Sequence, residues 1–442
     1  MLMVVSFLQR FKKYITNTSW LLSDKILSLG ITFAVTVIVT RYLGPERFGM
    51  LSYAISLTAL FASASHMGLG GLVVREIVKD HEERPLILGT SLVLKMSGAI
   101  VGYILLMIYA YRSEGWLTEN FYLILLVSTS MLALPFTGII SFWFESQVQG
   151  KYPSIAQLSG VITGSALKVL FVVLGAGLTF FALAHVLQSV IIAVLLLVLL
   201  HKTSGFSIAT WGFSFSKAKE LLSSGWVIFL GSIFAVIYLK VDQVMLRWLV
   251  GDKAVGVYSV AATMSEVWYF IPTAIVASFY PRLIELQKSD SGLYLKRLQQ
   301  IFDILFVVAL IVAIAVNLFA PYIISLFFGD AYNDAAAILI IHIWAALFVF
   351  MRAALSKWIL VENLLVFSMI TQGFGAFVNV ILNFYLIPFL GGQGAAIATL
   401  ISYATASYFS LLVTPKSRQI FVMMSKALLS PIRLPYIYLV RK

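Results

Sequence analysis

Long apolar runs of about 20 or more residues alternate with short polar connections along nearly the whole 442-residue chain. Runs of this length fit helices that cross a hydrocarbon core about 30 Å thick, whereas a β-barrel would show short alternating segments. The pattern predicts an all-α polytopic membrane protein with about twelve transmembrane helices. The expected spans are residues 15–40, 48–72, 86–110, 120–142, 152–175, 179–200, 219–247, 254–280, 300–328, 335–360, 364–388 and 392–413.

Composition supports this class and explains the net charge. Charged residues make up 11% of the chain and hydrophobic residues 61%, while soluble domains carry about 25% charged residues. Of the Lys and Arg residues, 22 fall on the side of the membrane that holds both termini and 5 on the other side. The positive-inside rule therefore predicts cytoplasmic termini. Because the net charge of +12 is spread over many short cytoplasmic loops, no nucleic-acid partner is expected.

The chain lacks the signatures of several other classes. Its first apolar run is too long for a cleavable signal and has no small-residue cleavage site, and it contains no cysteine. No phosphate-binding G-x-x-x-x-G-K-[ST] loop is present, and His81-Glu82 lacks the second histidine of a zinc helix. We therefore expect no metal and no cofactor. A membrane polymerase or ligase stays an alternative, but it would need a large external loop, and the longest connections, 201–218 and 281–299, are short.

Two segments of the chain resemble two later segments. RYLGPERFGMLSYA from Arg41 aligns with RWLVGDKAVGVYSVA from Arg247, so that Gly44 meets Gly251. QLSGVITGSALK from Gln157 aligns with QGFGAFVNVILN from Gln372. Chance matching in a restricted alphabet is the alternative for either pair alone. Together they predict two six-helix halves related by a pseudo-two-fold axis along the membrane normal, namely residues 1–200 and 219–413, with a cytoplasmic linker at 201–218 and a cytoplasmic or interfacial tail at 414–442.

The same segments resemble a known family. RYLGPERFGMLSYA, DQVMLRWLVGDKAVGVYSVA from Asp242 and NVILNFYLIPFLGGQGAAIATLISY from Asn379 are similar to segments of O-antigen and polysaccharide repeat-unit flippases of the Wzx type. These motifs are structural turns, so they indicate the superfamily of multidrug and oligosaccharidyl-lipid exporters more than a substrate. A cation-coupled multidrug antiporter with twelve spans therefore stays the main alternative.

The resemblance implies export of undecaprenyl-pyrophosphate-linked oligosaccharide from the cytoplasmic to the periplasmic leaflet of a bacterial inner membrane. It implies that a central cavity opens alternately to each side, and that a proton or cation drives the cycle. Membrane lipids, a polysaccharide polymerase and a chain-length regulator are the further partners implied. The protein would then be a transporter and not an enzyme.

Charged and polar residues inside the expected spans are the candidate site residues, because a charge at the bilayer centre costs about 2.5–3.5 kcal/mol and usually faces a cavity or a partner. The expected phosphate-binding residues are four lysines, Lys25, Lys95, Lys168 and Lys240. The expected polar lining of the cavity is Thr32, Thr36, Gln157, Gln372, Asn379 and Asn383, and the candidates for ion coupling are Asp24, Asp242 and Glu266.

Packing and local pairing are the alternatives for several of these residues. Small and amide residues mediate close helix contacts in membranes, so Gly98 and Gly102, which align with Lys95 on one helix face, fit packing as well as a cavity. Asp24 adjoins Lys25 and Asp242 lies near Lys240, so local ion pairs are conceivable there. Lys95 and Lys168 have no acidic residue within four positions, which favours the cavity for them.

Overall fold

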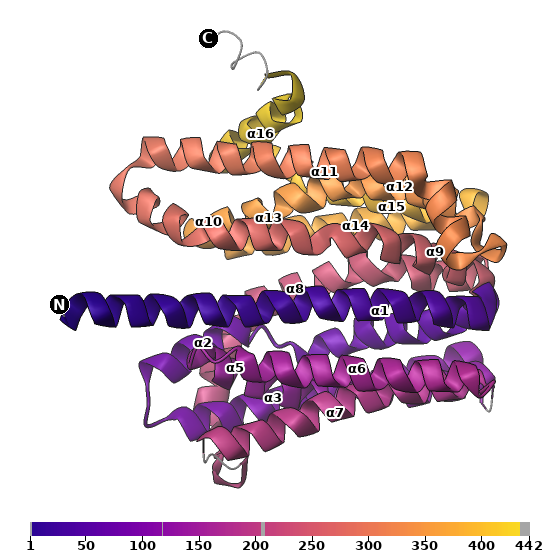
Figure 1. Cartoon of the computed structure of the whole chain (residues 1–442), viewed down its shortest axis with the longest axis horizontal. Helices are drawn as coiled ribbons and strands as arrows, with labels where there is room; N and C mark the ends of the chain where they lie inside the picture. Colours follow the sequence, from indigo (N-terminus) through magenta and orange to yellow (C-terminus); the bar gives the residue numbers. More distant parts are fainter. Residues whose placement is uncertain (1, 117, 205–207, 434–442) are drawn as a thin grey trace. The chain divides into compact units, whose positions relative to one another are not determined.

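The computed structural model describes residues 2–116, 118–204 and 208–433, and side chains from residue 16 onward. This part of the chain is helical except for short connections (Figure 1). Its helices are α1 (Leu2–Ala62), α2 (Gly70–Lys79), α3 (Arg84–Glu114), α4 (Glu119–Ser128), α5 (Leu134–Ser146), α6 (Lys151–Val173), α7 (Leu178–Ser204), α8 (Phe215–Leu249), α9 (Asp252–Glu266), α10 (Phe270–Ser289), α11 (Ser291–Phe328), α12 (Asp334–His342), α13 (Ala346–Val361), α14 (Leu365–Leu390), α15 (Gly392–Ser407) and α16 (Pro415–Leu428).

Eleven segments of the described chain are long and apolar enough to cross a membrane. The first of them, Thr16–Lys79, contains two helices, because Gly44 inside α1 adopts φ 71° and ψ 170° and breaks the helix there. Counting these two separately gives the twelve spans predicted from the sequence. The prediction of an all-α polytopic membrane protein is confirmed.

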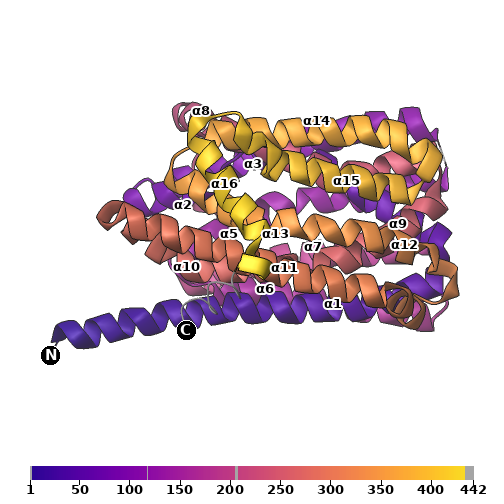
Figure 2. The same cartoon turned by 90° about the horizontal axis from the view of Figure 1, so that it is seen from above.

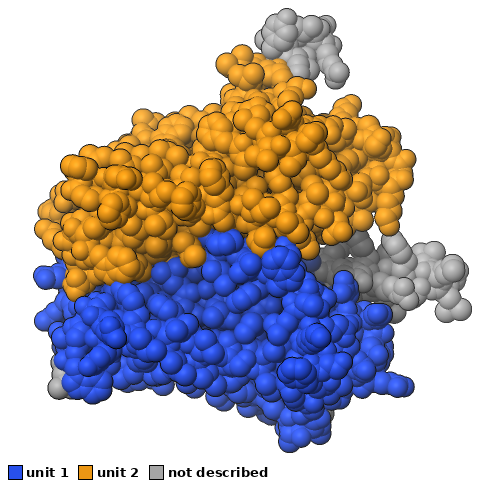
Figure 3. Space-filling view, turned by 180° about the vertical axis from the view of Figure 1, so that it is seen from behind, with its two compact units in different colours: residues 1–236 blue, residues 237–442 orange. Residues whose placement is uncertain are grey.

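The chain forms two compact units, residues 1–236 and 237–442, coloured separately in Figure 3. The division falls inside the continuous helix α8, whose first part belongs to unit 1 and whose last part belongs to unit 2. The predicted linker at 201–218 includes residues 205–207, which lie outside the described part of the chain. The predicted six-helix halves and their symmetry axis stay predictions.

The internal repeat has a counterpart in the backbone at the helix ends. Gly44 and Gly251 both have positive φ with extended ψ, and each leads into a new helix. Gly115 and Gly329 repeat this conformation after α3 and α11. Only glycine enters this region without a steric penalty from a Cβ atom. Equivalent turns in the two units therefore require glycine at equivalent places.

Short 3₁₀ segments interrupt corresponding spans of each unit. In unit 1 they are η1 (Ser63–Ser65) before α2 and η2 (Thr129–Leu132) between α4 and α5. In unit 2 they are η4 (Val267–Tyr269) between α9 and α10 and η6 (Ile343–Ala345) between α12 and α13. Such mid-helix 3₁₀ turns often mark hinges or strained sites. The repeat thus includes where the helices are interrupted as well as where they end.

The glycines of α3 are packing contacts. A Cβ atom on Gly98 would lie 2.5 Å from the carbonyl oxygen of Ala64, and one on Gly102 would lie 2.5 Å from that of Phe61. Both neighbours are backbone atoms that cannot move aside, so glycine is needed for the close approach of the helices. In unit 2, α14 and α15 lie side by side (Figure 2). A Cβ atom on Gly375 of α14 would lie 2.6 Å from the Cβ of Ala406 on α15. The packing alternative holds for all three.

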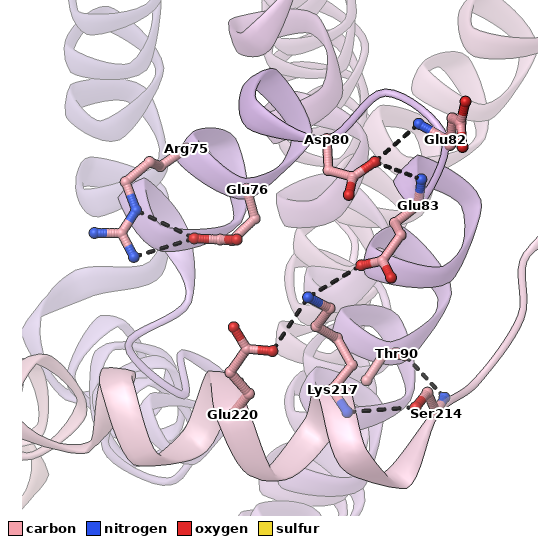
Figure 4. A network of polar contacts seen from close by, with 9 residues as sticks. All are labelled: Arg75, Glu76, Asp80, Glu82, Glu83, Thr90, Ser214, Lys217 and Glu220. Carbon is pink, nitrogen blue, oxygen red and sulfur yellow. Dashed lines mark hydrogen bonds and ion pairs between the residues drawn. The ribbon is translucent and has the colours of Figure 1, made fainter.

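A polar network joins the start of α8 to the turn between α2 and α3 in unit 1 (Figure 4). The ammonium of Lys217 lies 3.1 Å from a carboxylate oxygen of Glu83 and 3.1 Å from one of Glu220. The backbone N–H of Ser214 donates to Thr90 Oγ1 at 3.1 Å. The approach is close, since a Cβ on Gly89 would lie 2.2 Å from the carbonyl oxygen of Gly212.

Two sequence-based expectations need correction. The 22 charges assigned to the cytoplasmic side include Arg352 and Lys357, yet both lie inside α13, as they do inside the expected span 335–360. The expected span 364–388 ends at Pro388, yet α14 continues to Leu390, because a proline near the helix end costs few ladder bonds. The break falls at Gly391, with φ 53°. The tail contains α16, which packs on α11, and its place outside the membrane or at the interface stays a prediction. The last nine residues lie outside the described part.

Candidate functional site

Lys95 is the most deeply buried of the four lysines predicted to bind phosphate. It lies on α3 with 5% of its surface exposed. Its ammonium is 5.5 Å from the centre of the Phe142 ring on α5, and its side chain lies against Gly138, where a Cβ would be 3.0 Å from Lys95 Cε. Ser65 Oγ donates to the Lys95 backbone carbonyl at 3.0 Å. Within the described residues no carboxylate forms an ion pair with this ammonium.

The other three lysines have different surroundings. Lys25 on α1 is exposed, and Lys168 on α6 is half-buried near His185 of α7. Lys240 on α8 belongs to unit 2 and is half-buried near His342. Lys95 in turn interacts electrostatically with His66. Each of the three lysines Lys95, Lys168 and Lys240 therefore lies near a histidine of another segment.

The polar residues expected to line a cavity in unit 1 are partly exposed. Thr32 and Gln157 are exposed and Thr36 is half-buried. Asp24 is half-buried and accepts a hydrogen bond from Ser28 Oγ at 3.0 Å. The exposed side chains face solvent or lipid. The hydrogen bonds of the described residues do not join these side chains into one cluster.

Asp242 forms the centre of a buried polar cluster in unit 2. It lies on α8 and is 2% exposed. Its Oδ1 accepts a hydrogen bond from Asn383 Nδ2 at 2.6 Å, and its Oδ2 accepts hydrogen bonds from the Tyr258 hydroxyl at 2.6 Å and from Thr399 Oγ1. The donors come from α14, α9 and α15, so four helices meet at one carboxylate. Asn383 Nδ2 also donates to Asn379 Oδ1 at 3.1 Å.

This cluster contains three of the expected site residues. Asn379 and Asn383 are fully buried, and Asn383 is bound to both Asp242 and Asn379, so their part in lining a cavity stays a prediction. Asp242 does not pair with Lys240, because side chains two residues apart on a helix point in different directions. Three atoms around the cluster, Asn379 Nδ2, Asn383 Oδ1 and His342 Nδ1, have no hydrogen-bond partner among the described residues. A spare acceptor beside a buried carboxylate, such as Asn383 Oδ1, is what a bound proton or cation would use.

Gln372 lies in a second cluster of unit 2, around Arg352, which the sequence analysis missed. The Arg352 guanidinium donates to the Ala406 carbonyl oxygen at 3.2 Å and to Ser368 Oγ at 3.0 Å. Gln372 Nε2 donates to the same Ser368 Oγ at 3.2 Å. The position of Arg352 inside the expected span 335–360 was the signal that could have identified it as an intramembrane charge. Glu266 at the end of α9 is half-buried and interacts electrostatically with Tyr403.

Comparison with known proteins places the chain in a family. A family described as "Polysaccharide biosynthesis protein" matches residues 14–287, more than half of the chain. The chain belongs to this family. A protein of Haloferax volcanii named as a probable flippase, AglR, is 23% identical over 405 residues, which cover 87% of this chain and 80% of the relative. A protein of Shigella flexneri named for O-antigen transport is 23% identical over 329 residues, covering 72% and 78%.

Solved structures show the same fold at low identity. The lipid II flippase MurJ in an inward closed conformation superposes with a TM-score of 0.72 at 16% identity, covering 96% of this chain and 93% of that one. An inward-facing multidrug resistance transporter of the MATE family superposes with a TM-score of 0.68 at 18% identity, covering 90% and 96%. The chain therefore has the same fold as these two membrane transporters.

Proposed function

We propose that this protein carries undecaprenyl-pyrophosphate-linked oligosaccharide from the cytoplasmic to the periplasmic leaflet of a bacterial inner membrane. The relatives named for flipping or transporting glycans support this substrate class. The oligosaccharide is too polar to cross the hydrocarbon core unaided. The protein is accordingly a transporter and not an enzyme.

Lys95 is the observation that carries the proposal. The Lys95 side chain is 5% exposed and lies on a membrane-spanning helix, and its ammonium forms no ion pair with a carboxylate of the described chain. Such a charge is unfavourable unless it serves a ligand. Ammonium groups bind phosphate as point charges, and the pyrophosphate of the carrier lipid supplies such a charge. Lys25, Lys168 and Lys240 add positive charge along the path. A multidrug antiporter that exports cations would gain nothing from these lysines.

The cluster around Asp242 supplies the coupling step. A carboxylate held by three hydrogen-bond donors is positioned to bind a proton or a cation and to release it when the surrounding helices move. The alternating-access cycle then combines a cationic path for the headgroup with an acidic site for the driving ion. Asp24 and Glu266 are further candidates for the coupling group. Antiporters also need an acidic site, so this cluster supports ion coupling but does not distinguish the two kinds of substrate. The lysines are the residues that favour an anionic substrate.

Deletion of the gene is the direct test of the substrate. Loss of the protein should make lipid-linked repeat units accumulate in the cytoplasmic leaflet and should reduce surface polysaccharide. Increased drug sensitivity with normal polysaccharide would instead support the antiporter.

Substitutions at Lys168 test the sign of the cavity. Lys168 is half-buried. Lys168→Arg should retain more export than Lys168→Gln, because a charge-assisted contact to phosphate contributes about 1.5–3 kcal/mol. Lys25→Ala and Lys95→Ala should impair export as well. If Lys168→Gln exports as well as the wild type, the cationic path is wrong at this position.

A further inference from the structure

Arg352 is an intramembrane arginine with unused hydrogen-bonding capacity. A guanidinium has five N–H donors. In the described chain two of them are used, by the Ala406 carbonyl oxygen and by Ser368 Oγ. Both acceptors are neutral, and no ion pair to Arg352 occurs among the described residues. Three donors and a full positive charge are left for another partner.

The position of Arg352 argues against simple snorkelling. It lies nine residues before Val361, the last residue of α13, or about 13 Å from that helix end at 1.5 Å per residue. Its side chain is bound sideways to α14 and α15 instead of extending toward the end of the helix. Lys357 on the same helix differs, because it lies closer to the helix end and places its ammonium 4.8 Å from the centre of the Tyr280 ring.

The surroundings of Arg352 are polar and partly open. The side chains of Arg352, Ser368, Gln372 and Tyr238 are all half-buried in this chain. Tyr238 of α8 interacts electrostatically with Arg352 and packs edge-on against Tyr403 of α15, with ring centres 5.1 Å apart. Four helices of unit 2 therefore surround the guanidinium with hydroxyl, amide and aromatic groups. A purely structural arginine in a membrane would be expected to have a carboxylate partner or saturated donors.

We propose that Arg352 binds an oxyanion of the transported molecule, either a phosphate of the lipid carrier or a carboxylate of an acidic sugar. Its free donors match the planar, paired oxygens of these groups. Ser368 holds the guanidinium and Gln372 is bound to the same Ser368 hydroxyl, while the half-buried Tyr238 offers an aromatic ring to a sugar. This assignment rests on the proposed function and adds to it a substrate-binding residue in unit 2.

The test measures binding by the full-length protein in lipid nanodiscs. The probes are undecaprenyl pyrophosphate, the neutral undecaprenol and free glucuronate, each titrated against the wild type and three variants. We expect Arg352→Gln to bind undecaprenyl pyrophosphate about 10- to 100-fold more weakly and Arg352→Lys to lie between, because lysine keeps the charge without the planar fork. The matched control Lys357→Gln should bind within about twofold of the wild type.

The outcomes separate the sources of the oxyanion. Loss of pyrophosphate binding in Arg352→Gln assigns the residue to the phosphates. Unchanged pyrophosphate binding with loss of glucuronate binding assigns it to an acidic sugar. Wild-type affinity of Arg352→Gln for both probes overturns the assignment and leaves the proposed function in place. If the wild type binds glucuronate but no pyrophosphate, the proposed carrier lipid is wrong, and the arginine is judged on glucuronate alone.

Folding of the variants is checked by thermal unfolding and by a single symmetrical elution peak. If Arg352→Gln does not fold, Arg352→Lys decides. Weaker binding of either charged probe, with unchanged unfolding temperature and unchanged undecaprenol binding, supports the assignment. Wild-type affinity of the lysine variant for both charged probes then overturns the guanidinium-specific contact.

Discussion

Replacing Lys95 with methionine should make the protein more stable and less active. Methionine has a similar length and suits the apolar surroundings of α3 and α5. An intramembrane lysine costs about 2.5–3.5 kcal/mol, and the contact with the Phe142 ring returns about 0.5–2 kcal/mol. With no carboxylate partner in the described chain, the remaining cost is about 0.5–3 kcal/mol. Lys95→Met should recover it.

The assay combines unfolding with export. In nanodiscs the unfolding temperature of Lys95→Met should rise by several degrees, since domains of 150–250 residues shift about 2–4 °C per kcal/mol. Surface polysaccharide in a complemented deletion strain should fall. Lys151→Met is the matched control, because Lys151 is exposed and lies 5.7 Å from the centre of the Trp20 ring. It should change stability by less than about 0.5 kcal/mol and leave export unchanged.

Two results would refute this reasoning. A lower unfolding temperature for Lys95→Met would mean that the ammonium stabilises unit 1 through contacts that the side-chain geometry does not supply. Normal export by a stabilised Lys95→Met would mean that the lysine is an uncompensated charge without a role in transport.

Three further predictions test other parts of the structure. Asp242→Asn should abolish gradient-driven transport in proteoliposomes, because the amide places an N–H against the Tyr258 and Thr399 hydroxyls. Binding of undecaprenyl pyrophosphate should stay within about twofold of the wild type. Transport that still follows the ion gradient would exclude this cluster from coupling. Cysteines at Ser113 and Asp330 should react with an impermeant thiol reagent in intact cells, and those at Lys79 and Lys288 only after permeabilisation; the opposite pattern would reverse the topology. Gly394→Ala should lower the unfolding temperature, because its Cβ would lie 2.5 Å from the Leu386 carbonyl oxygen. Gly392→Ala should be tolerated, especially with Ile338→Val, because its closest contact is the end of the Ile338 side chain. Equal stability of the two glycine variants would contradict this difference in packing.

The helices were predictable from the sequence because their signals are local. Each span is a continuous apolar run, and the turns at Gly44 and Gly251 follow from glycine at a position of positive φ. The buried partners were not predictable in this way. Asp242 is bound by residues 141 and 157 positions away in the chain, and the sequence offered Lys240, two residues away, as a nearer partner. The expected span 335–360 did contain Arg352, but no local signal showed that its guanidinium contacts residues of α14 and α15.

The glycines at the helix ends have a consequence for how the two units can diverge. Any side chain at Gly44, Gly115, Gly251 or Gly329 would be strained, so mutation is restricted at these four points while the apolar residues of the helices can be exchanged freely for one another. After duplication of an ancestral unit, the turns would therefore keep a record of common origin long after the helices had lost it. An alignment of the two units anchored on these turns should place the lysines of one unit opposite unrelated residues of the other, which is how a symmetric ancestor can acquire a transport path with a different chemistry in each half.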